Sequence, residues 1–479
     1  MIDPAQSWPS GVVAWLQCLV RQRLHPDLLL SHDRPGIFEL HLPAGHQRIT
    51  IATDRRVFDR AGSDQPMSWW DAETEGWPSA LGGPLPAPGA TVVPRPLIKS
   101  NTGDGYRVDY DIFGLTYWAL SRREEVGATS HDRHGRFPVT SAHAMCHGYL
   151  DRPVVDEWFL LLRHLLQRLW PGLNLTPLIP TIHVSHDIDQ PSRYAFQTPF
   201  GLARAIGGDL FSRGRWLDAC WAPWIWMRSR DRLNPRDPYN SFDWLMELSE
   251  AASLRSTFFV KAGQTDLAYD NPYTLDHPAI SDLLCRIHSR GHRIGLHPSY
   301  HTWRDPAALS HEANLLRSRC AALGIHQDIT DCRMHYLRWD HPDTMRHIAG
   351  AGFTCDGTLG YGMISGFRCA TCHSFPAIDP VTKQTMPLRI QPLVFMDAAE
   401  TKMSLTTATT IEQALNRITA LFDRCAIVGG NISVLWHNSE LWRPVWRQLY
   451  ASLVIIAKDR TTKRSTDSVG ETSVNRKTG

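Results

Sequence analysis

The chain has 479 residues, enough for roughly two to four domains that each bury a core of their own. Hydrophobic residues make up 43% of it and charged residues 20%, which is the balance of a folded protein and excludes a disordered or fibrous chain. Because 50 Lys and Arg face 48 Asp and Glu, the formal charge of +2 gives no overall basic field, and nucleic acid is not an expected partner.

The cysteine spacing and the first residues of the chain indicate in which cellular compartment we expect the protein. Ten cysteines at irregular spacing do not make the dense framework of a disulfide-rich protein and indicate buried thiols in a reducing environment. The apolar run from Val12 to Val20 is interrupted by Gln17, and only Asp3 is charged before it. A secretory signal carries a basic region there, and a membrane span needs about 20 apolar residues. We therefore expect a cytoplasmic protein with no membrane span.

Residues 1–175 are predicted to form a smaller mixed α/β domain. Two short apolar segments, 36–42 and 48–52, flank a Pro-Ala-Gly turn, which is typical of a β-hairpin. A helix is predicted over 155–169, where apolar residues recur on one helical face until Pro171 and Gly172. We place the end of this domain near Leu175.

From residue 176 to 457 the pattern changes to short apolar strands that alternate with helices. The strands are expected at 180–185, 256–260, 292–296 and 431–436. This alternation is typical of a parallel sheet, closed or open. An insertion from about 198 to 240 carries Trp216, Trp221, Trp224 and Trp226, and residues 458–479 are predicted to be a disordered polar tail.

Acidic and imidazole side chains follow three of these strands. Asp187 and Asp189 end the first, His297 and His301 follow the third, and His437 follows the last. In parallel α/β folds, catalytic groups gather at the carboxyl ends of strands, so residues far apart in sequence can build one site. We expect these five to converge.

The spacings point to a metal. Asp187 and Asp189 lie on one side of an extended chain, where two carboxylates repel each other unless a cation is near. His297 and His301 are four apart, which would place both imidazoles on one face of a helical turn. Two His and one carboxylate with a free position for water describe a catalytic zinc site.

Each pattern also has a plainer interpretation. A His-x3-His pair arises by chance among 23 histidines, Asp-x-Asp is often a turn or helix cap, and a single His such as His437 is often a core residue. Their common position after strands favours the functional interpretation.

Residues 180 to about 457 resemble the NodB-homology polysaccharide deacetylases, also grouped as carbohydrate esterase family 4. The matching segments are His186-Asp-Ile-Asp189, Ser256-Thr-Phe-Phe-Val260, Gly291-His-Arg-Ile-Gly-Leu-His-Pro-Ser-Tyr-His301, Arg333-Met-His-Tyr336 and Leu435-Trp-His437. The third is the most specific. Residues 1–175, with Asp111-Ile-Phe-Gly-Leu-Thr-Tyr117 and Gly148-Tyr-Leu-Asp-Arg-Pro-Val154, resemble the amino-terminal domain of a bacterial subgroup, for which no activity is implied.

This resemblance implies a distorted (β/α) barrel of about seven strands that removes an N-acetyl group from a carbohydrate, either a glycan or a glycan precursor. It implies a divalent metal, with zinc expected, held by Asp189, His297 and His301. A metal in such a site polarises a water molecule and the acetyl carbonyl.

The resemblance also assigns the catalytic roles. Asp187 would take the proton of the water, and Arg333 would pair with Asp187 and orient it. The backbone N–H of Tyr336 would stabilise the oxyanion, and His437 would protonate the leaving amine.

The chain departs from the family pattern at several positions. Ile188 separates the two aspartates, so the roles of Asp187 and Asp189 could be exchanged. Arg338 competes with Arg333, and His335 stands where the motif has a proline. Asp356 matches the fourth motif only loosely, and a supporting role and a turn role are equally open for it.

Other functions stay open from the sequence. The same chemistry could act on another amide or on an O-acetyl ester, or the chain could be a silent carbohydrate-binding or scaffold protein. Asp187, Arg333 and His437 argue against silence, because binding alone needs no acid and base. Cys369-Ala-Thr-Cys372-His373 fits c-type haem attachment, a second metal site or a redox pair, but plain thiols are favoured.

Overall fold

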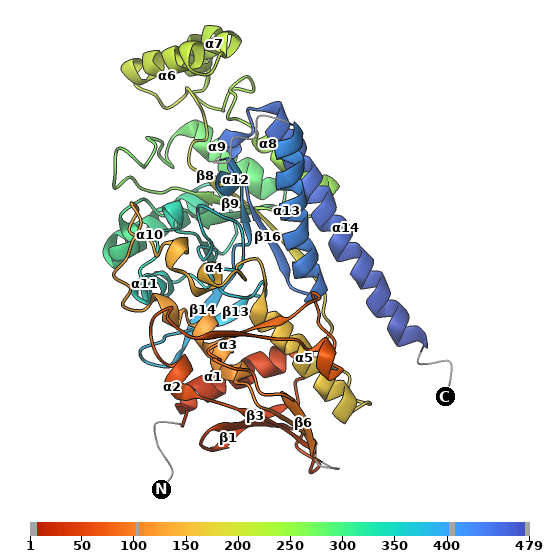
Figure 1. Ribbon diagram of the computed structural model, residues 1–479. Coiled ribbons are helices and arrows are strands. Elements are labelled where there is room, and N and C mark those ends of the chain that lie inside the picture. The colour runs from red at the N-terminus through yellow and green to blue at the C-terminus, as the bar shows by residue number, and fades with distance from the viewer. Residues whose placement is uncertain (1–6, 102–104, 402–407, 475–479) are drawn as a thin grey trace.

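Two large sheets organise the chain in the computed structural model, one in the first third of the sequence and one in the remainder (Figure 1). The structure describes residues 7–101, 105–401 and 408–474, without the side chains of 400–410 and 463–474.

The first sheet has five strands in the order β1-β2-β3-β7-β6. The predicted hairpin is present as β2 and β3, which pair antiparallel with Phe38 opposite Ile51. The strands of this part are β1 Leu29–Arg34, β2 Ile37–His41, β3 Arg48–Ala52, β6 Ile98–Asn101 and β7 Gly105–Val108, with β4 Met67–Trp70 and β5 Leu85–Pro88 as a separate pair. Alternate residues of β3, Ile49 and Ile51, are buried, as expected for a strand with one face on a core.

Five helices accompany these strands. They are α1 Ser10–Arg23, α2 Arg55–Phe58, α3 Ile112–Leu120, α4 His143–Cys146 and α5 Val154–Leu169. The helix predicted over 155–169 is α5, and its apolar face is buried together with Trp158, which stacks on Trp70 at 5.6 Å between ring centroids.

The second sheet has nine strands in the order β13-β14-β12-β11-β10-β9-β8-β16-β15. Their bounds are β8 Thr181–Ile188, β9 Thr257–Val260, β10 Arg293–Leu296, β11 Asp331–Cys332, β12 Cys355–Asp356, β13 Phe375–Ile378, β14 Thr385–Ile390, β15 Phe395–Met396 and β16 Asn431–Leu435. All neighbours pair in parallel except β13 and β14. The expected α/β class is therefore confirmed, with a curled sheet in which, among the described residues, β13 and β15 form unpaired ends.

The strand count differs from the expected seven or so. Three of the nine strands, β11, β12 and β15, have two residues each, which is too short for an apolar run to reveal. The helices of this part are α6 Pro199–Phe211, α7 Trp216–Arg228, α8 Phe242–Ala251, α9 Pro278–Ser289, α10 Pro306–Ala322, α11 Asp343–Gly350, α12 Asp397–Thr401, α13 Ala408–Ile427 and α14 Pro444–Val474. Of these, α6 and α7 project away from the body of the molecule (Figure 1).

Parallel pairing brings several strand ends to one edge. Ile188 at the end of β8 lies opposite Val260 at the end of β9, and Leu296 at the end of β10 lies opposite Cys332. Residues that follow these strands therefore meet at the same edge of the sheet, as in other α/β folds.

The two parts of the chain are joined by buried contacts. Trp15 Nε1 donates to the backbone oxygen of Pro376 at 2.7 Å, and Arg23, which pairs with Asp156 within the amino-terminal part at 2.9 Å, donates to Thr371 Oγ1 at 3.4 Å. Asp156 also accepts from the backbone N–H of Cys372 at 2.9 Å. One apolar core runs through both parts, and the predicted boundary near Leu175 falls in the irregular segment between α5 and β8.

Helix α14 overlaps the stretch 458–479 that is predicted to be a disordered tail. Helix α14 continues through residues 458–474, and residues 475–479 lie outside the described part. Its first half is packed, with Trp446, Tyr450 and Leu453 buried, and adding further turns to an existing helix costs little. No helix of the described residues has the length and apolarity to cross a membrane.

Asp111 links three segments of the amino-terminal part. Its Oδ1 accepts from the backbone N–H of Gly114 at 2.6 Å and so caps α3. Its Oδ2 accepts from Thr53 Oγ1 and from the backbone N–H of Asp54, both at 2.7 Å. Asp111, Thr53 and Gly114 are buried, whereas Asp54 is exposed.

We expect Asp111→Ala to lower the free energy of unfolding by about 2–4 kcal/mol, because it removes a helix cap and leaves buried donors without acceptors. Urea or thermal denaturation measures this loss. Asp64→Ala is the control, since that side chain is 70% exposed and should change stability by less than about 0.5 kcal/mol. Equal effects of the two substitutions would contradict the role given to Asp111.

Candidate active site and metal centre

A cavity of about 250 Å³ opens at the carboxyl edge of the second sheet. The structure brings most of the predicted site residues to it. Its lining includes Asp187, Asp189, His297, Tyr336 and His437, together with His335, Arg133, His134 and Arg136.

Three ligand atoms converge on one side of this cavity. Asp189 Oδ1 lies 3.1 Å from His297 Nε2 and 3.4 Å from His335 Nε2. Among the described residues, Asp189, His297 and His335 form the group of His, Cys, Asp or Glu whose ligand atoms are close enough to hold one metal ion.

The hydrogen bonds behind the two imidazoles define their tautomers. His297 Nδ1 lies 2.6 Å from the backbone oxygen of Arg333, and a carbonyl can only accept, so this nitrogen carries the proton. His335 Nδ1 lies 2.9 Å from Asp270 Oδ1 and donates in the same way. In the neutral rings both Nε2 atoms are then lone-pair acceptors directed at another acceptor, the carboxylate of Asp189.

Three acceptors cannot face one another in a buried site without a cation or a proton between them. Asp189 Oδ1 has no hydrogen-bond partner among the described residues, although it is buried. Burial lowers the pKa of His335, but the charge of Asp189 and the hydrogen bond with Asp270 outweigh it and raise this pKa. The donor set fits a divalent metal, since two imidazole nitrogens and one carboxylate oxygen are the ligands of catalytic zinc sites.

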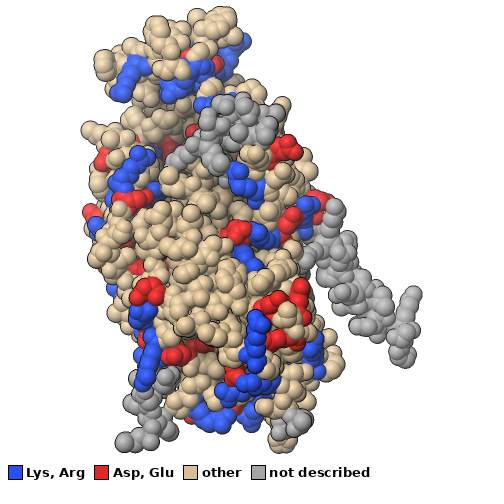
Figure 2. Space-filling view, in the orientation of Figure 1, with Lys and Arg blue, Asp and Glu red and all other residues tan. Residues whose placement is uncertain are grey.

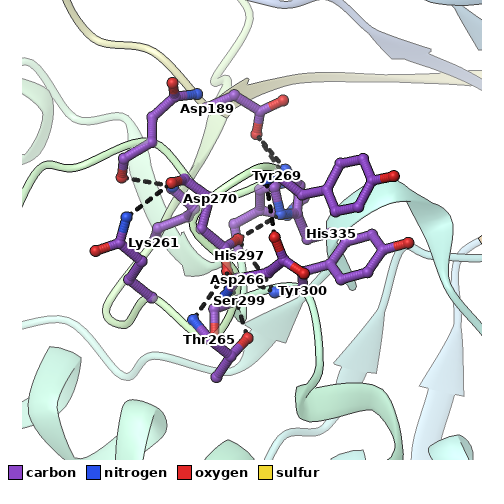
Figure 3. A network of polar contacts seen from close by, with 12 residues as sticks. Asp189, Lys261, Thr265, Asp266, Tyr269, Asp270, His297, Ser299, Tyr300 and His335 are labelled. Carbon is purple, nitrogen blue, oxygen red and sulfur yellow. Dashed lines mark hydrogen bonds and ion pairs between the residues drawn. The ribbon is translucent and has the colours of Figure 1, made fainter. Parts of the chain in front are cut away.

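Asp270 supports His335 from behind, as carboxylates commonly do for metal-binding histidines. It accepts from the backbone N–H groups of Thr265 at 2.9 Å, Asp266 at 3.0 Å and Tyr300 at 3.1 Å (Figure 3). Burial raises the pKa of Asp270, but the hydrogen bond from His335 and its charge outweigh this effect and lower the pKa to about 2. The ring of His335 is therefore held in one orientation.

His301 does not join this group. The chain after β10 is irregular rather than helical, so a spacing of four residues does not place His297 and His301 on one face. His301 Nε2 lies 3.1 Å from Asp266 Oδ2, and its side chain is 53% exposed. His335, rather than His301, is the second imidazole of the cluster.

Asp187 lies beside the cluster in a buried ion pair. Arg333 Nη1 donates to Asp187 Oδ1 at 2.9 Å and to Ser185 Oγ at 2.8 Å. Arg333 Nε donates to the backbone oxygen of Gly357 at 2.9 Å, so the guanidinium has a fixed position. Asp187 Oδ2 is 3.7 Å from His297 Nε2, farther than Asp189 Oδ1, which favours Asp189 as the ligand and Asp187 as the base.

Two other residues raised by the sequence lie outside the cluster. Arg338, the competitor of Arg333, donates from Nη1 to the backbone oxygen of Tyr300 at 2.6 Å. Asp356 on β12 is fully buried, and burial raises its pKa to about 7. Asp356 accepts from Thr358 Oγ1, whose oxygen accepts from the backbone N–H of Met334 at 3.0 Å. Asp356 thus supports the loop that carries Arg333.

His437 follows β16, the strand next to β8, and therefore lies beside Asp187 at the edge of the cluster. Its Nε2 lies 3.7 Å from Asp189 Oδ2, and its Nδ1 lies 2.7 Å from Asp397 Oδ1. Asp397 Oδ2 also accepts from the backbone N–H of His437 at 2.8 Å. Burial lowers the pKa of His437, but the charge and hydrogen bond of Asp397 outweigh it and raise the pKa to about 10. The sequence analysis missed Asp397, which directly follows the two-residue strand β15.

The turn that carries His335 has an unusual backbone. Tyr336 has φ 58° and Leu337 has φ 53°, the left-handed region that residues with a Cβ rarely adopt. The amino-terminal part holds this turn: His134 lies against the Tyr336 ring at 4.6 Å, and Arg136 Nη1 donates to the backbone oxygen of Tyr336 at 2.7 Å. No pattern in the sequence pointed to His134 or Arg136.

The Cys369-Ala-Thr-Cys372-His373 segment packs in the core. Both thiols are fully buried, and burial raises their pKa values. Cys372 Sγ lies 3.4 Å from Asp156 Oδ2, and His373 Nε2 lies 3.0 Å from the backbone oxygen of Val428. This packing leaves no space for a haem and suits the plain thiols that the sequence favoured.

Comparisons with known proteins add the following. A family model described as a family of unknown function (DUF7033) matches residues 19–171. No curated protein matches the chain.

Solved structures that resemble the chain include a protein from Mycobacterium smegmatis named as a polysaccharide deacetylase. Its sequence is 16% identical, the match covers 60% of this chain and 86% of that one, and the TM-score is 0.37. They also include Puue allantoinase, with 12% identity, 60% and 86% coverage and a TM-score of 0.36. A chitin deacetylase from the fungus Colletotrichum lindemuthianum has 15% identity, 47% and 76% coverage and a TM-score of 0.28. At these TM-scores the roles of individual residues rest on the geometry of this chain.

We expect His335→Ala and His297→Ala to bind a divalent metal at least about tenfold more weakly than the unchanged protein, since each removes one of three ligands. Dialysis against a chelator followed by elemental analysis measures the metal that remains.

His301→Ala is the matched control, because the same change four residues from His297 removes an exposed ring and should leave the metal in place. Loss of metal in His301→Ala together with retention in His335→Ala would contradict the ligand set given above.

Proposed function

We propose that the chain is a metal-dependent hydrolase that removes an N-acetyl group from a carbohydrate, a glycan or a glycan precursor. One observation carries this proposal: the ligand atoms of Asp189, His297 and His335 converge beside the Asp187–Arg333 pair and the His437–Asp397 pair, all at one cavity. A binding or scaffold protein needs no proton acceptor and cationic proton donor around a metal, so the arrangement supports hydrolysis.

Asp189, His297 and His335 would hold the metal, and Zn²⁺ is the expected ion for this donor set. When bound, such an ion polarises the acetyl carbonyl and makes a nearby water more acidic.

Asp187 is positioned to take the proton of that water. Its Oδ1 is engaged by Arg333, which leaves Oδ2 on the side of His297 and the cluster. The buried guanidinium prevents the carboxylate from rotating, and orientation of this kind is a large part of the effect of a catalytic base. Arg333 thus acts as a positioning residue.

His437 is positioned to return a proton to the leaving nitrogen. It lines the same cavity as Asp187, from the neighbouring strand, and the buried carboxylate of Asp397 favours its protonated form. An amine is a poor leaving group unless it is protonated, whereas a stabilised alkoxide or phenoxide leaves without that help. The backbone N–H of Tyr336, in the strained turn on the cavity wall, is the proposed donor to the oxyanion.

We expect the purified protein to release acetate from N-acetylated sugars and Asp187→Asn to lose at least about a hundredfold in turnover, because an amide cannot accept the proton. Acetate release from a panel of N-acetylated sugars, O-acetylated sugars and simple amides measures both. The metal should stay bound in this variant.

The panel also separates the competing functions. Release from the O-acetyl esters or simple amides alone would change the substrate class while keeping the site. No release from any compound by a metal-loaded protein would contradict hydrolysis and favour a silent binding protein. Loss of metal in Asp187→Asn would show that Asp187 and Asp189 have the opposite roles.

We expect His437→Ala to slow amide substrates by about 10²–10⁴-fold and activated esters much less, because only the amine needs a proton to leave. Parallel rates on an N-acetyl sugar and an aryl acetate measure the difference. Equal losses on both would remove His437 from the role of proton donor.

A further inference from the structure

A pair of helices projects from the body of the molecule between β8 and α8. Helix α6 and helix α7 form this hairpin, which lies at the top of Figure 1. Thr198 caps the first helix by accepting from the backbone N–H of Gly201 at 3.1 Å. The hairpin plays no part in the cavity described above.

The inner faces of the two helices form a small core of their own. Leu202 and Ala205 of α6 pack with Ala222 and Ile225 of α7 in a cluster separate from the main core. The base of the hairpin is fixed by Asp209, which is buried and accepts from Tyr194 OH at 2.7 Å. The hairpin is therefore a folded unit with a defined inner and outer face.

The outer faces are apolar and exposed. Phe211 is 90% exposed and Phe200 is 81% exposed. The exposed large apolar residues of the hairpin are Phe200, Leu210, Phe211, Trp216, Leu217, Trp221, Trp224 and Met227. A group of this size on the surface marks a site that another apolar surface covers.

Helix α7 is apolar on two sides. Ala219, Ala222 and Ile225 face the inner core, while Leu217, Trp221 and Trp224, spaced four and three residues apart, are exposed. A helix that faces water on one side would carry polar residues there. The exposed stripe therefore indicates a second covering surface.

Exposed arginines accompany this apolar surface in the sequence. The exposed arginines between residues 198 and 240 are Arg204, Arg213, Arg228, Arg230, Arg232 and Arg236, and Asp231 is the exposed acidic residue of that stretch. Of the other acidic side chains there, Asp209 and Asp237 are buried and Asp218 pairs with Arg215 at 2.8 Å. In Figure 2 the outer end of the hairpin is uncharged, and blue atoms gather along its side toward the body.

We propose that this hairpin docks the protein on an anionic lipid membrane. Trp and Phe side chains at the outer end would enter the boundary between headgroups and acyl chains, and the arginines behind them would contact lipid phosphates. The 13 residues of α7 are too few to span a bilayer, so the hairpin lies in one leaflet.

The positive charge of this face argues against a second copy of the chain as the surface that covers it. A symmetric dimer through this face would bring the arginines of one copy against those of the other. The phosphates of an anionic membrane instead neutralise them. The docking is independent of the chemistry proposed for the cavity.

The experiment measures co-sedimentation of the full chain with vesicles of phosphatidylcholine alone or with about 30% phosphatidylglycerol. We expect binding to the anionic vesicles, reduced in high salt because surface charges are screened. The triple variant Phe200→Ser, Phe211→Ser, Trp216→Ser should bind about a hundredfold more weakly, since it removes the inserting side chains. These residues are exposed, so the fold should be retained.

A second variant tests the charge. Arg204→Gln, Arg228→Gln and Arg230→Gln together should weaken binding to anionic vesicles by about a hundredfold without affecting the small residual binding to neutral ones. The matched control Val92→Ser, Val381→Ser, Ile455→Ser removes three exposed apolar side chains elsewhere and should bind like the unchanged protein.

Three outcomes would overturn the proposal. One is failure of the unchanged protein to bind anionic vesicles, and another is equal binding by the hairpin variants. The third is a concentration-dependent dimer that the Phe200, Phe211 and Trp216 substitutions abolish, which would identify the face as an interface between copies.

Discussion

The ligand atoms of Asp189, His297 and His335 meet at the edge of the second sheet, and hydrogen bonds to the far side of each imidazole keep them directed at one another. The backbone oxygen of Arg333 holds the proton of His297 on the far side of its ring, and Asp270 does the same for His335. Asp270 is in turn held by backbone N–H groups. Because buried acceptors that face each other are costly, this edge is stable only around a cation or a proton.

Much of this edge could be predicted from the sequence, because one topological rule connects distant residues. Once 180–185, 292–296 and 431–436 are identified as parallel strands, the residues after them must meet, and Asp187, Asp189, His297 and His437 do so. His335 and Asp397 were not predicted, because neither lies in a segment with a recognisable periodic pattern. His335 lies in a turn with positive φ, and Asp397 follows a strand of two residues. His301 was misplaced because a spacing of four residues implies a shared face only on a helix.

The fold, like the site, could be predicted only in part from the sequence. The long strands and amphipathic helices, such as α5, follow from local patterns that the sequence displays directly. The strands β11, β12 and β15 exist because neighbouring strands offer hydrogen bonds, and that information lies in the assembled sheet rather than in the segments themselves. The extra turns of α14 likewise depend on the packed helix that precedes them.

The turn at Tyr336 and Leu337 is held in its strained conformation partly by His134 and Arg136, which lie within the segment matched by the family of unknown function. Both parts of the chain therefore contribute to the wall of the candidate site. A recombination event that replaced residues 19–171 with those of an unrelated protein would leave Tyr336 without these contacts. We therefore expect the two parts to be inherited as one unit, with changes at 132–136 accompanied by changes at 335–338.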